Sequence, residues 1–452
     1  MNQTGINSRQ SEIEKAALEV LQTLRNAGHD AFWVGGCVRD KLLNLPIQEI
    51  DIATSASPQT VMRLLPKTIA VGAHFGVVVA MVGDIKIEVA TFRSDGAYLD
   101  NRHPSEVHFS DVRQDAMRRD FTINALFWDP ISGRLLDFVK GREDLQKGIL
   151  RCIGKAEDRF GEDALRLLRA VRFSIRFNFP IEDETWRAML SCSSLIKRIS
   201  AERVRDELIR IFTEENRGKA LEMLENSRIL KEILPEVQAL KGVPQPEEFH
   251  PEGDCFEHTK LSLDALRSPS AALAFGCLLH DIGKPPTFTK AERIRFDGHT
   301  KIGALMADAI CRRLCFSNDE REKITDLVAR HMHFLSVKDM RISTLRRFLS
   351  HPNIEEDLEL HRADCLASHG GLENYEFCRD KLEEFRAEQK EIIPPPLVTG
   401  EDLIAAGYKP GPLFKEILKR IQEAQMEGEI KNRADALALS AKEFPLPEVK
   451  RQ

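Results

Sequence analysis

Two acidic side chains near the N-terminus have the spacing of a metal-binding pair. Glu49 and Asp51 are two residues apart in the β-rich stretch EIDIAT. Residues two apart on a strand project to the same face, so these carboxylates can share a divalent cation such as Mg²⁺. Glu88, in the stretch IKIEVATF, can supply a third carboxylate. A solvent-facing strand also carries acids at this spacing, so the pair alone leaves both interpretations open.

A glycine turn precedes the acidic pair. Gly35 and Gly36 separate the apolar stretch AFWV from the helix-like stretch VRDKLL. The backbone N–H groups of a strand-to-helix turn can face a phosphate group. A plain turn would explain the glycines equally well, but the carboxylates that follow favour phosphate binding.

Histidine and aspartate residues in the second half of the chain form another candidate metal site. Imidazole and carboxylate ligands together suit a transition metal or Mg²⁺. Isolated histidines are usually core or surface residues, whereas an ordered set favours metal binding. We expect a helix ending at Gly283 to aim the central pair into a shared pocket. The set comprises His258, His280, Asp281 and Asp364, and His299 and His331 can complete a second metal position.

The elements that position these residues change in type near residue 156. Apolar positions at helical spacing predict a helix over 11–28 that ends at Gly28. β-rich stretches follow, and Gly83 and Asp84 join the last two as a tight hairpin. From about residue 156 the apolar periodicity is helical. The predicted fold class is therefore α+β, with an α/β region first and mostly α-helical regions after it.

Length and loop composition predict several domains. A chain of 452 residues exceeds what one hydrophobic core usually serves. The proline-rich polar loops PQPEEFHPEGD and EIIPPPLVTG suit boundaries. A third boundary is placed near residue 156, where the periodicity changes. The predicted domains are therefore 1–155, 156–245, 246–395 and 396–452.

Bulk properties exclude several classes of protein. The chain has no apolar leader and no membrane-spanning stretch, so we expect a cytoplasmic protein without membrane contact. Its nine cysteines lack CxxC spacing, which argues against a disulfide framework and a zinc ribbon. The net charge of −6 argues against binding nucleic acid through the overall field, although a local basic groove remains compatible with it.

Five ordered motifs resemble those of the class II tRNA nucleotidyltransferases and bacterial poly(A) polymerases, members of the polymerase-β-like superfamily. The stretch GGCVRDKLLNLPIQEIDIATSASP resembles the opening motif. RRDFTINALFWDP resembles the ribose-contacting motif, and LDFVKGREDLQKGILRCIG the hinge-like motif. EDALRLLRAVRFSIRF resembles the base-selecting motif, and AERVRDEL the fifth. The resemblance runs over about residues 30–235 and implies a nucleotidyltransferase head at 1–155 with a helical nucleotide- and RNA-binding domain at 156–245.

The resemblance also implies roles for individual residues. Glu49 and Asp51 would hold Mg²⁺ for attack of an RNA 3′ hydroxyl on the α-phosphate, with Glu88 as a third acid. Asp163 and Arg166, three residues apart on a predicted helix, would share a face and read the Watson–Crick edge of one base. The remaining nucleotide-binding candidates are Gly35, Gly36, Arg39, Asp40, Arg118, Arg119, Asp120, Asn124 and Arg169.

One position departs from the family pattern. The opening motif usually has aspartate at both carboxylate positions, whereas this chain has Glu49 at the first. Because a glutamate moves the oxygens by one methylene, slower activity, altered metal preference or a degenerate site are the alternatives.

Arginines recur at three- and four-residue intervals in the base-selecting motif. Arg166, Arg169, Arg172 and Arg176 would line one side of a helix, as in a surface that follows RNA phosphates. A solvated or salt-bridged helix face has the same spacing.

The later histidines follow the H…HD…D order that resembles the HD metal-dependent phosphohydrolase superfamily, with LLHDIGKP as its most distinctive segment. This resemblance implies an HD domain at 246–395 that acts on 2′,3′-cyclic phosphates, 2′-nucleotides or phosphomonoester ends. The segment after GEDLIAAGYKPGP resembles the family's helical tail, for which RNA contact and structural packing both remain open.

The leading functional hypothesis is addition of CCA, or only CC or A, to the 3′ end of tRNA from CTP and ATP. Poly(A) polymerase is the nearest alternative, although the nearly uncharged stretch AVGAHFGVVVAMVGD lacks the basic segment that marks many such enzymes. A phosphohydrolase with a degenerate first domain and a non-enzymatic RNA-binding protein are further alternatives. The oligomeric state does not follow from the sequence.

Overall fold

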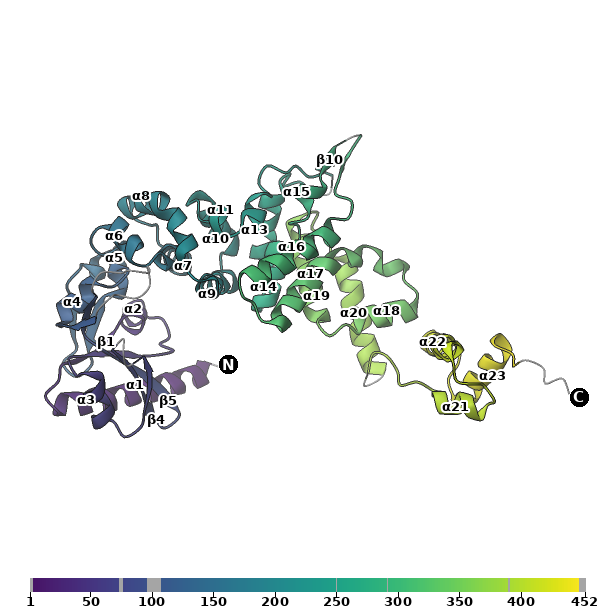
Figure 1. Ribbon diagram of the computed structural model, residues 1–452, viewed down its shortest axis with the longest axis horizontal. Coiled ribbons are helices and arrows are strands. Elements are labelled where there is room, and N and C mark those ends of the chain that lie inside the picture. Colours follow the sequence, from purple (N-terminus) through teal and green to yellow (C-terminus); the bar gives the residue numbers. More distant parts are fainter. Residues whose placement is uncertain are drawn as a thin grey trace, which may run out of the picture. The chain divides into compact units, whose positions relative to one another are not determined.

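The computed structural model describes residues 3–72, 76–95, 107–248, 250–290, 292–388 and 391–446. The chain divides into two compact units (Figure 1). The first comprises Met1–Gln238 with Arg313–Phe316, and the second comprises Ala239–Arg312 with Ser317–Gln452. The division into four domains stays a prediction.

A seven-stranded mixed sheet lies in the first unit, in the order β3-β4-β5-β2-β1-β8-β9. The pair β2–β5 is parallel, and the other neighbouring strands are antiparallel. Gly83, with φ of 59°, turns the chain between β4 and β5, which confirms the predicted hairpin. The strands are β1 (Ala31–Val34), β2 (Asp51–Thr54), β3 (Thr68–Gly72), β4 (Val77–Val82), β5 (Ile85–Thr91), β8 (Leu126–Asp129) and β9 (Arg134–Asp137), and β6 (Arg93–Asp95) pairs separately with β7 (Val107–Phe109).

Helix α1 (Gln3–Asn26) packs on this sheet and begins earlier than the predicted start near residue 11. One apolar face of α1 is buried, including Leu21 and Leu24, which are fully inaccessible to solvent. Gly28 follows the helix with φ of 86°, a left-handed conformation that favours glycine, and so confirms the predicted end.

Short helices connect the strands, and a helical layer follows them. Gly141 allows α5 to approach Thr122 closely, because a Cβ at this position would lie 2.1 Å from the Thr122 carbonyl oxygen. The elements are α2 (Gly36–Leu42), α3 (Pro58–Leu64), α4 (Val112–Met117), the 3₁₀ helix η2 (Thr122–Asn124), α5 (Gly141–Lys147), α6 (Ala156–Glu162), α7 (Leu165–Phe177), α8 (Asp183–Cys192), η3 (Ser193–Arg198), α9 (Ala201–Thr213), α10 (Arg217–Asn226), α11 (Leu230–Ile233) and α12 (Pro235–Gln238).

Among its described residues, the second unit is helical apart from one short hairpin. Together with the helices of the first unit from α6 onward, this confirms the predicted change to helix near residue 156. Ser317 and Glu320 form a capping box at the start of α17, and Asp254 caps α13. The segment after Val398 has its own small core, which includes Leu403, Ile417 and Ile421. The elements are α13 (Cys255–Ala265), α14 (Ala271–Leu279), α15 (Lys284–Thr287), β10 (Thr289–Lys290), β11 (Ile294–Arg295), α16 (His299–Arg313), α17 (Asn318–Arg330), η4 (His331–Asp339), α18 (Ile342–Leu349), α19 (Ile354–Ala367), α20 (Glu373–Glu388), α21 (Gly400–Ala405), α22 (Pro412–Met426) and α23 (Arg433–Glu443).

A search of the described helices finds none with the length and apolar character needed to cross a membrane.

Candidate active site and candidate metal centre

Strand pairing brings two of the predicted carboxylates together. Asp51 is the first residue of β2, where it pairs with Val34 on one side and with Glu88 on the other. Burial, and then the charges of Glu88 and Glu49, raise the pKa of Asp51 to about 7. Burial and the charge of Glu49 also raise the pKa of Glu88. The three acids therefore repel one another where β2 begins beside β5, an arrangement that a bound cation would stabilise.

Glu49 does not lie on the strand, contrary to the predicted β alternation. Pairing of β2 begins at Asp51, so Glu49 belongs to the unpaired segment before it and is exposed. Among the described residues, Glu49, Asp51 and Glu88 do not form one of the groups whose potential ligand atoms all lie within 4.8 Å of one another.

The glycine turn leaves the sheet beside Asp51. Gly35 has φ of 75° and precedes α2, and its N–H donates to the Leu126 carbonyl oxygen at 3.2 Å. A Cβ at Gly35 would lie 3.4 Å from Arg119 Nη1, and the charge of Arg119 acts to lower the pKa of Asp51. The glycine turn, which includes Gly36, therefore lies near both the Arg119 guanidinium and the Asp51 carboxylate.

A residue that the sequence analysis missed orients both arginines of the second motif. The buried carboxylate of Asp115 accepts hydrogen bonds from Arg118 at 2.8 Å and from Arg119 at 2.9 Å. Burial raises the pKa of Asp115, but the charges of Arg119 and Arg118 outweigh it and lower this pKa. The signal was present in the spacing DAMRR, which puts the acid three and four residues before the arginines on a helix.

A chain of buried polar contacts links α2 to α7. Arg39 donates to Asn124 Oδ1 at 2.5 Å and to Asp40 at 2.8 Å. Asn124 donates in turn to Asp120 at 3.1 Å, and Arg169 donates to Asp120 at 2.6 Å. Burial raises the pKa of Asp120, but Arg169 and the other hydrogen-bond donors bring it down to about 2. Five predicted nucleotide-site residues are therefore fixed in one network.

The arginines of α7 are ion-paired, as expected for the salt-bridged alternative. Arg166 pairs with Glu162 at 2.7 Å, and Arg172 pairs with Glu207 at 2.8 Å. Arg169 pairs with Asp120, and Arg176 lies 3.6 Å from Asp40. Arg166 and Arg172 are buried. Glu207, also buried, is a second residue that the sequence analysis missed.

Asp163 and Arg166 do not share a helix, contrary to the prediction. Helix α6 ends at Glu162, Asp163 is extended, and α7 begins at Leu165. The Asp163 side chain accepts a hydrogen bond from the Leu165 N–H at 3.1 Å, a local contact that competes with continuous helix. Its carboxylate pairs with Arg203 at 2.8 Å.

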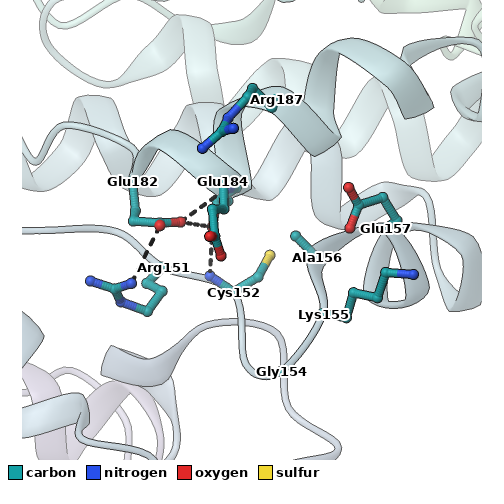
Figure 2. A pocket seen from close by; sticks show the side chains of 10 residues that line it. Arg151, Cys152, Gly154, Lys155, Ala156, Glu157, Glu182, Glu184 and Arg187 are labelled. Atoms are coloured by element: carbon teal, nitrogen blue, oxygen red, sulfur yellow. Dashed lines mark hydrogen bonds and ion pairs between the residues drawn. The ribbon is translucent and has the colours of Figure 1, made fainter.

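A polar cavity of about 370 Å³ lies elsewhere in the first unit, between α6, α8 and the segment before α6 (Figure 2). Arg151 spans part of it and lies 3.4 Å from Glu182. Neither the carboxylates nor the glycine turn lines this cavity.

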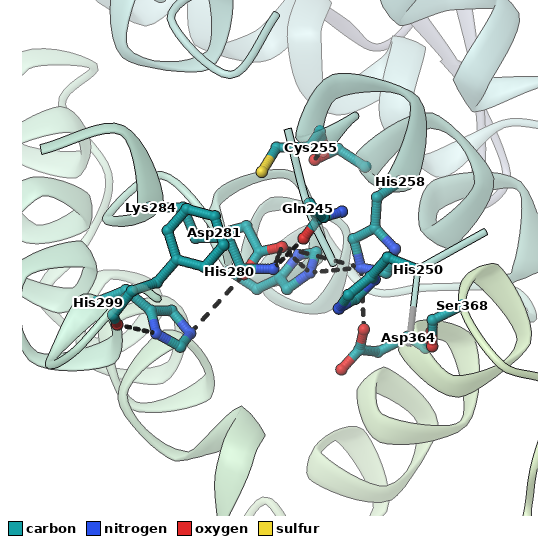
Figure 3. Close-up of polar contacts among 12 residues, drawn as sticks. Gln245, His250, Cys255, His258, His280, Asp281, Lys284, His299, Asp364 and Ser368 are labelled. Atoms are coloured by element: carbon teal, nitrogen blue, oxygen red, sulfur yellow. Dashed lines mark hydrogen bonds and ion pairs between the residues drawn. The ribbon is translucent and has the colours of Figure 1, made fainter. Parts of the chain in front are cut away.

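The predicted histidines and aspartates of the second unit do come together (Figure 3). His258, His280 and Asp364 form one group of ligand atoms within 4.8 Å, and Asp281, His299 and His331 form another. His258 Nε2 is 2.9 Å from Asp364 Oδ1 and 3.2 Å from His280 Nε2. Helix α14 ends at Leu279 rather than at Gly283, so His280 and Asp281 lie in the turn that follows.

Asp281 lies between the two groups. Its Oδ2 is 3.3 Å from His280 Nε2, and its Oδ1 is 3.8 Å from His331 Nε2 and 3.9 Å from His299 Nε2. Asp281 would supply a carboxylate ligand for a divalent ion held with His299 and His331. Burial raises the pKa of Asp281, but the charges of His280 and Lys284 lower it well below its usual range.

Backbone contacts orient three of the imidazoles. The Nδ1 atoms of His280, His299 and His331 each lie 2.7 to 2.9 Å from the carbonyl oxygen three residues earlier. This contact places the proton on Nδ1 and leaves Nε2 as the metal-binding atom. Burial, followed by the charge of His280, lowers the pKa of His331 to about 3, which keeps it neutral. The donor set therefore fits divalent metal ions.

Residues outside the predicted set support this cluster. Glu252 Oε1 lies 2.7 Å from His258 Nδ1, and Lys284 Nζ lies 2.7 Å from Asp281 Oδ2. Lys284 also donates to Gln245 at 2.5 Å. Glu252 and Gln245 come from the proline-rich loop that the sequence analysis treated only as a boundary.

Three family models match the chain. Residues 31–151 match the poly A polymerase head domain, 178–241 the probable RNA and SrmB-binding site of polymerase A, and 256–368 the HD domain.

Curated relatives that match the chain include CCA-adding enzymes. The one from Streptococcus gordonii is 30% identical over 439 residues, which cover 96% of this chain and 98% of that protein. The one from Oceanobacillus iheyensis is 41% identical over 270 residues, which cover 60% of this chain and 64% of that protein.

Solved structures extend the likeness to the fold. The CCA-adding enzyme of Bacillus stearothermophilus in complex with CTP has a TM-score of 0.70 and 28% identity, and the match covers 95% of this chain and 97% of that one. The Thermotoga maritima CCA-adding enzyme complexed with tRNA has a TM-score of 0.61 and 19% identity over 98% of this chain and 96% of that one, which supports the fold alone.

Proposed function

Because this chain belongs to the family of the CCA-adding enzymes, we propose that it adds CCA to the 3′ end of tRNA from CTP and ATP. We place this reaction in the cytoplasm. The observation that carries the proposal is the strand register that sets Asp51 beside Glu88 and beside the glycine turn with Arg119. Addition of poly(A) is the alternative that the same type of head domain permits.

The three acids Glu49, Asp51 and Glu88 suit the transfer of a nucleotide to an RNA. The RNA 3′ oxygen forms a bond to the α-phosphorus, while the bond from that phosphorus to the oxygen shared with the β-phosphate breaks and pyrophosphate leaves. Glu49 and Asp51 would hold Mg²⁺, with Glu88 as the third acid. Bound Mg²⁺ supplies activation of the attacking hydroxyl and neutralisation of the leaving group.

Basic and polar residues around the acids would position the nucleotide. Arg118 and Arg119, oriented by Asp115, would contact the triphosphate, with the N–H groups of Gly35 and Gly36 beside them. Arg39, Asp40, Asp120, Asn124 and Arg169 would keep this surface rigid through their shared network. Asp163 and Arg166 would read the base, which requires them to exchange their contacts to Arg203 and Glu162 for the base.

The test uses tRNA transcripts that end before CCA, after C and after CC, each incubated with Mg²⁺ and labelled CTP, ATP or both. Completion of all three to CCA is expected. Extension by one nucleotide specificity would make the protein a CC- or A-adding enzyme, and long A tails would make it a poly(A) polymerase. No incorporation by the wild type or by Glu49→Asp would contradict the proposal.

For the second unit we propose a metal-dependent phosphohydrolase. His258, His280 and Asp364 would hold one divalent ion, and Asp281, His299 and His331 would hold a second. This activity is tested with p-nitrophenyl phosphate and a 2′,3′-cyclic mononucleotide, in the presence of Mg²⁺, Mn²⁺, Co²⁺ or Ni²⁺ in turn. Hydrolysis that His280→Ala removes is expected, and the absence of hydrolysis with every metal would contradict the proposal.

A further inference from the structure

A short basic hairpin begins and ends at the histidine–aspartate cluster. Strands β10 and β11 pair Thr289 with Arg295 and Lys290 with Ile294. Figure 1 shows this hairpin extending away from the helices of its unit. It leaves the cluster after Lys284, which pairs with Asp281, and returns to it at His299, whose Nδ1 contacts the Phe296 carbonyl oxygen at 2.9 Å.

The hairpin carries exposed cations that outnumber its acids. Lys290, Arg293 and Arg295 are exposed, and Glu292 is the hairpin's one acid. None of the three cations forms an ion pair with any residue in the described part of the chain. Arg379, an exposed cation elsewhere in this unit, pairs with the neighbouring Asp380. Three unpaired cations on a two-stranded ribbon attract a polyanion, although the protein as a whole is acidic.

Two aromatic rings lie at the base of the hairpin. Phe288 and Phe296 are partly buried and have ring centroids 5.9 Å apart. Lys284 Nζ is 5.4 Å from the centroid of Phe296. Partly exposed aromatic side chains beside cations form the surface on which single-stranded nucleic acid stacks its bases while its phosphates are neutralised.

We propose that this hairpin binds the 3′-terminal nucleotides of a single-stranded RNA, so that the substrate of the second site is a phosphate at an RNA 3′ end rather than a free nucleotide. The inference rests on the proposed phosphohydrolase activity. Lys290, Arg293 and Arg295 contact the RNA backbone, the phenylalanines contact a base, and the terminal phosphate reaches the cluster between Lys284 and His299.

The test compares two substrates of the full-length protein loaded with the metal that gives the highest activity. One is a 2′,3′-cyclic mononucleotide, and the other is a short RNA that ends in a 2′,3′-cyclic phosphate. In the triple variant Lys290→Ala, Arg293→Ala, Arg295→Ala, we expect kcat/KM for the RNA to fall at least about tenfold at low salt, mainly through KM. The slope of log kcat/KM against log salt concentration should become less steep by about 2. Hydrolysis of the mononucleotide should stay unchanged.

A matched control removes three cations from α20 through Arg379→Ala, Lys381→Ala and Arg386→Ala, which are ion-paired. It should leave both substrates unaffected. An unchanged RNA rate in the hairpin variant, or an equal loss on both substrates, would overturn the RNA-binding role. Wild-type protein that hydrolyses the mononucleotide but not the RNA would overturn this inference alone, whereas hydrolysis of neither would overturn the phosphohydrolase proposal with it.

Discussion

Glu49, where the sequence analysis expects a departure from the family pattern, lies before β2, and this position leads us to expect that its charge matters more than the length of its side chain. Because Glu49 is exposed and lies outside the paired strand, its longer side chain can adjust toward a cation held by Asp51. Its charge acts on both Asp51 and Glu88.

We therefore expect Glu49→Gln to lower kcat/KM for nucleotide incorporation by about 10²-fold, while Glu49→Asp stays within about tenfold of the wild type. Incorporation is measured over a range of Mg²⁺ concentrations, with thermal unfolding as the control for folding. Full activity of Glu49→Gln would show that this residue does not hold the metal.

Asp120 gives a pH-dependent contribution to stability. Its pKa is about 2 in the folded protein against a usual 3.8, so the contribution is present above 3.8 and is lost as the pH falls through about 2. The melting temperature of the wild type should exceed that of Asp120→Asn most above about pH 5, and the difference should shrink below about pH 4.

Tryptophan fluorescence measures this difference in the first unit, which contains Trp33, Trp128 and Trp186, all three tryptophans of the chain. Asp158→Asn is the control, because Asp158 is exposed and its carboxylate comes no closer than 4.0 Å to the Lys155 ammonium group. A difference between wild type and Asp120→Asn that does not vary with pH would contradict the role given to Arg169.

At the scale of elements, the start of α16 packs against the turn that carries His280 and Asp281. A Cβ at Gly283 would lie 2.0 Å from the His299 carbonyl oxygen and 2.7 Å from the Gly303 N–H nitrogen. The backbone conformation of Gly283 is one that any residue adopts. The requirement for glycine therefore comes from this close approach. The approach brings His299 beside Asp281.

Gly283→Ala should displace the start of α16 and so remove His299 from its group. We expect the amount of divalent metal bound by the protein to fall and phosphohydrolase activity to drop at least about tenfold, because packed backbone cannot absorb the added atom. Metal content and activity are compared with Gly411→Ala, where the added Cβ meets nothing closer than 4.0 Å. Normal metal content in Gly283→Ala would show that this contact does not position His299.

At the scale of the whole molecule, each candidate centre is built from one unit only. The carboxylates and the arginines belong to Met1–Gln238, and the histidine cluster belongs to the unit that contains Ala239–Arg312. Compact units with their own cores can perform separate chemistry.

Asp51→Asn should therefore lower nucleotide incorporation by at least about 10²-fold and leave hydrolysis of p-nitrophenyl phosphate within about twofold. His280→Ala should have the opposite pattern. Both activities are measured on each variant. A loss of incorporation in His280→Ala would reveal that the histidine cluster also supports the first reaction.

The sequence by itself indicated the family and the order of its strand-rich and helical regions, and it supplied the candidate residues for both centres. These properties depend on local information: the helical or β period, the glycines of a turn, and motifs whose spacing is preserved along the chain. Gly28, Gly83 and the change to helix near residue 156 could be predicted for this reason.

Tertiary structure alone decided which side chains meet. The pairing of Asp51 with Glu88 depends on strand order, and Arg169 reaches Asp120 across 49 residues of chain. Glu207, Glu252 and Gln245 had no local signal, because their partners are brought near only when helices and loops pack. Asp163 shows that a local pattern can also mislead. Periodicity alone predicted a continuous helix, but the Asp163 side chain accepts a hydrogen bond from the Leu165 N–H and interrupts it.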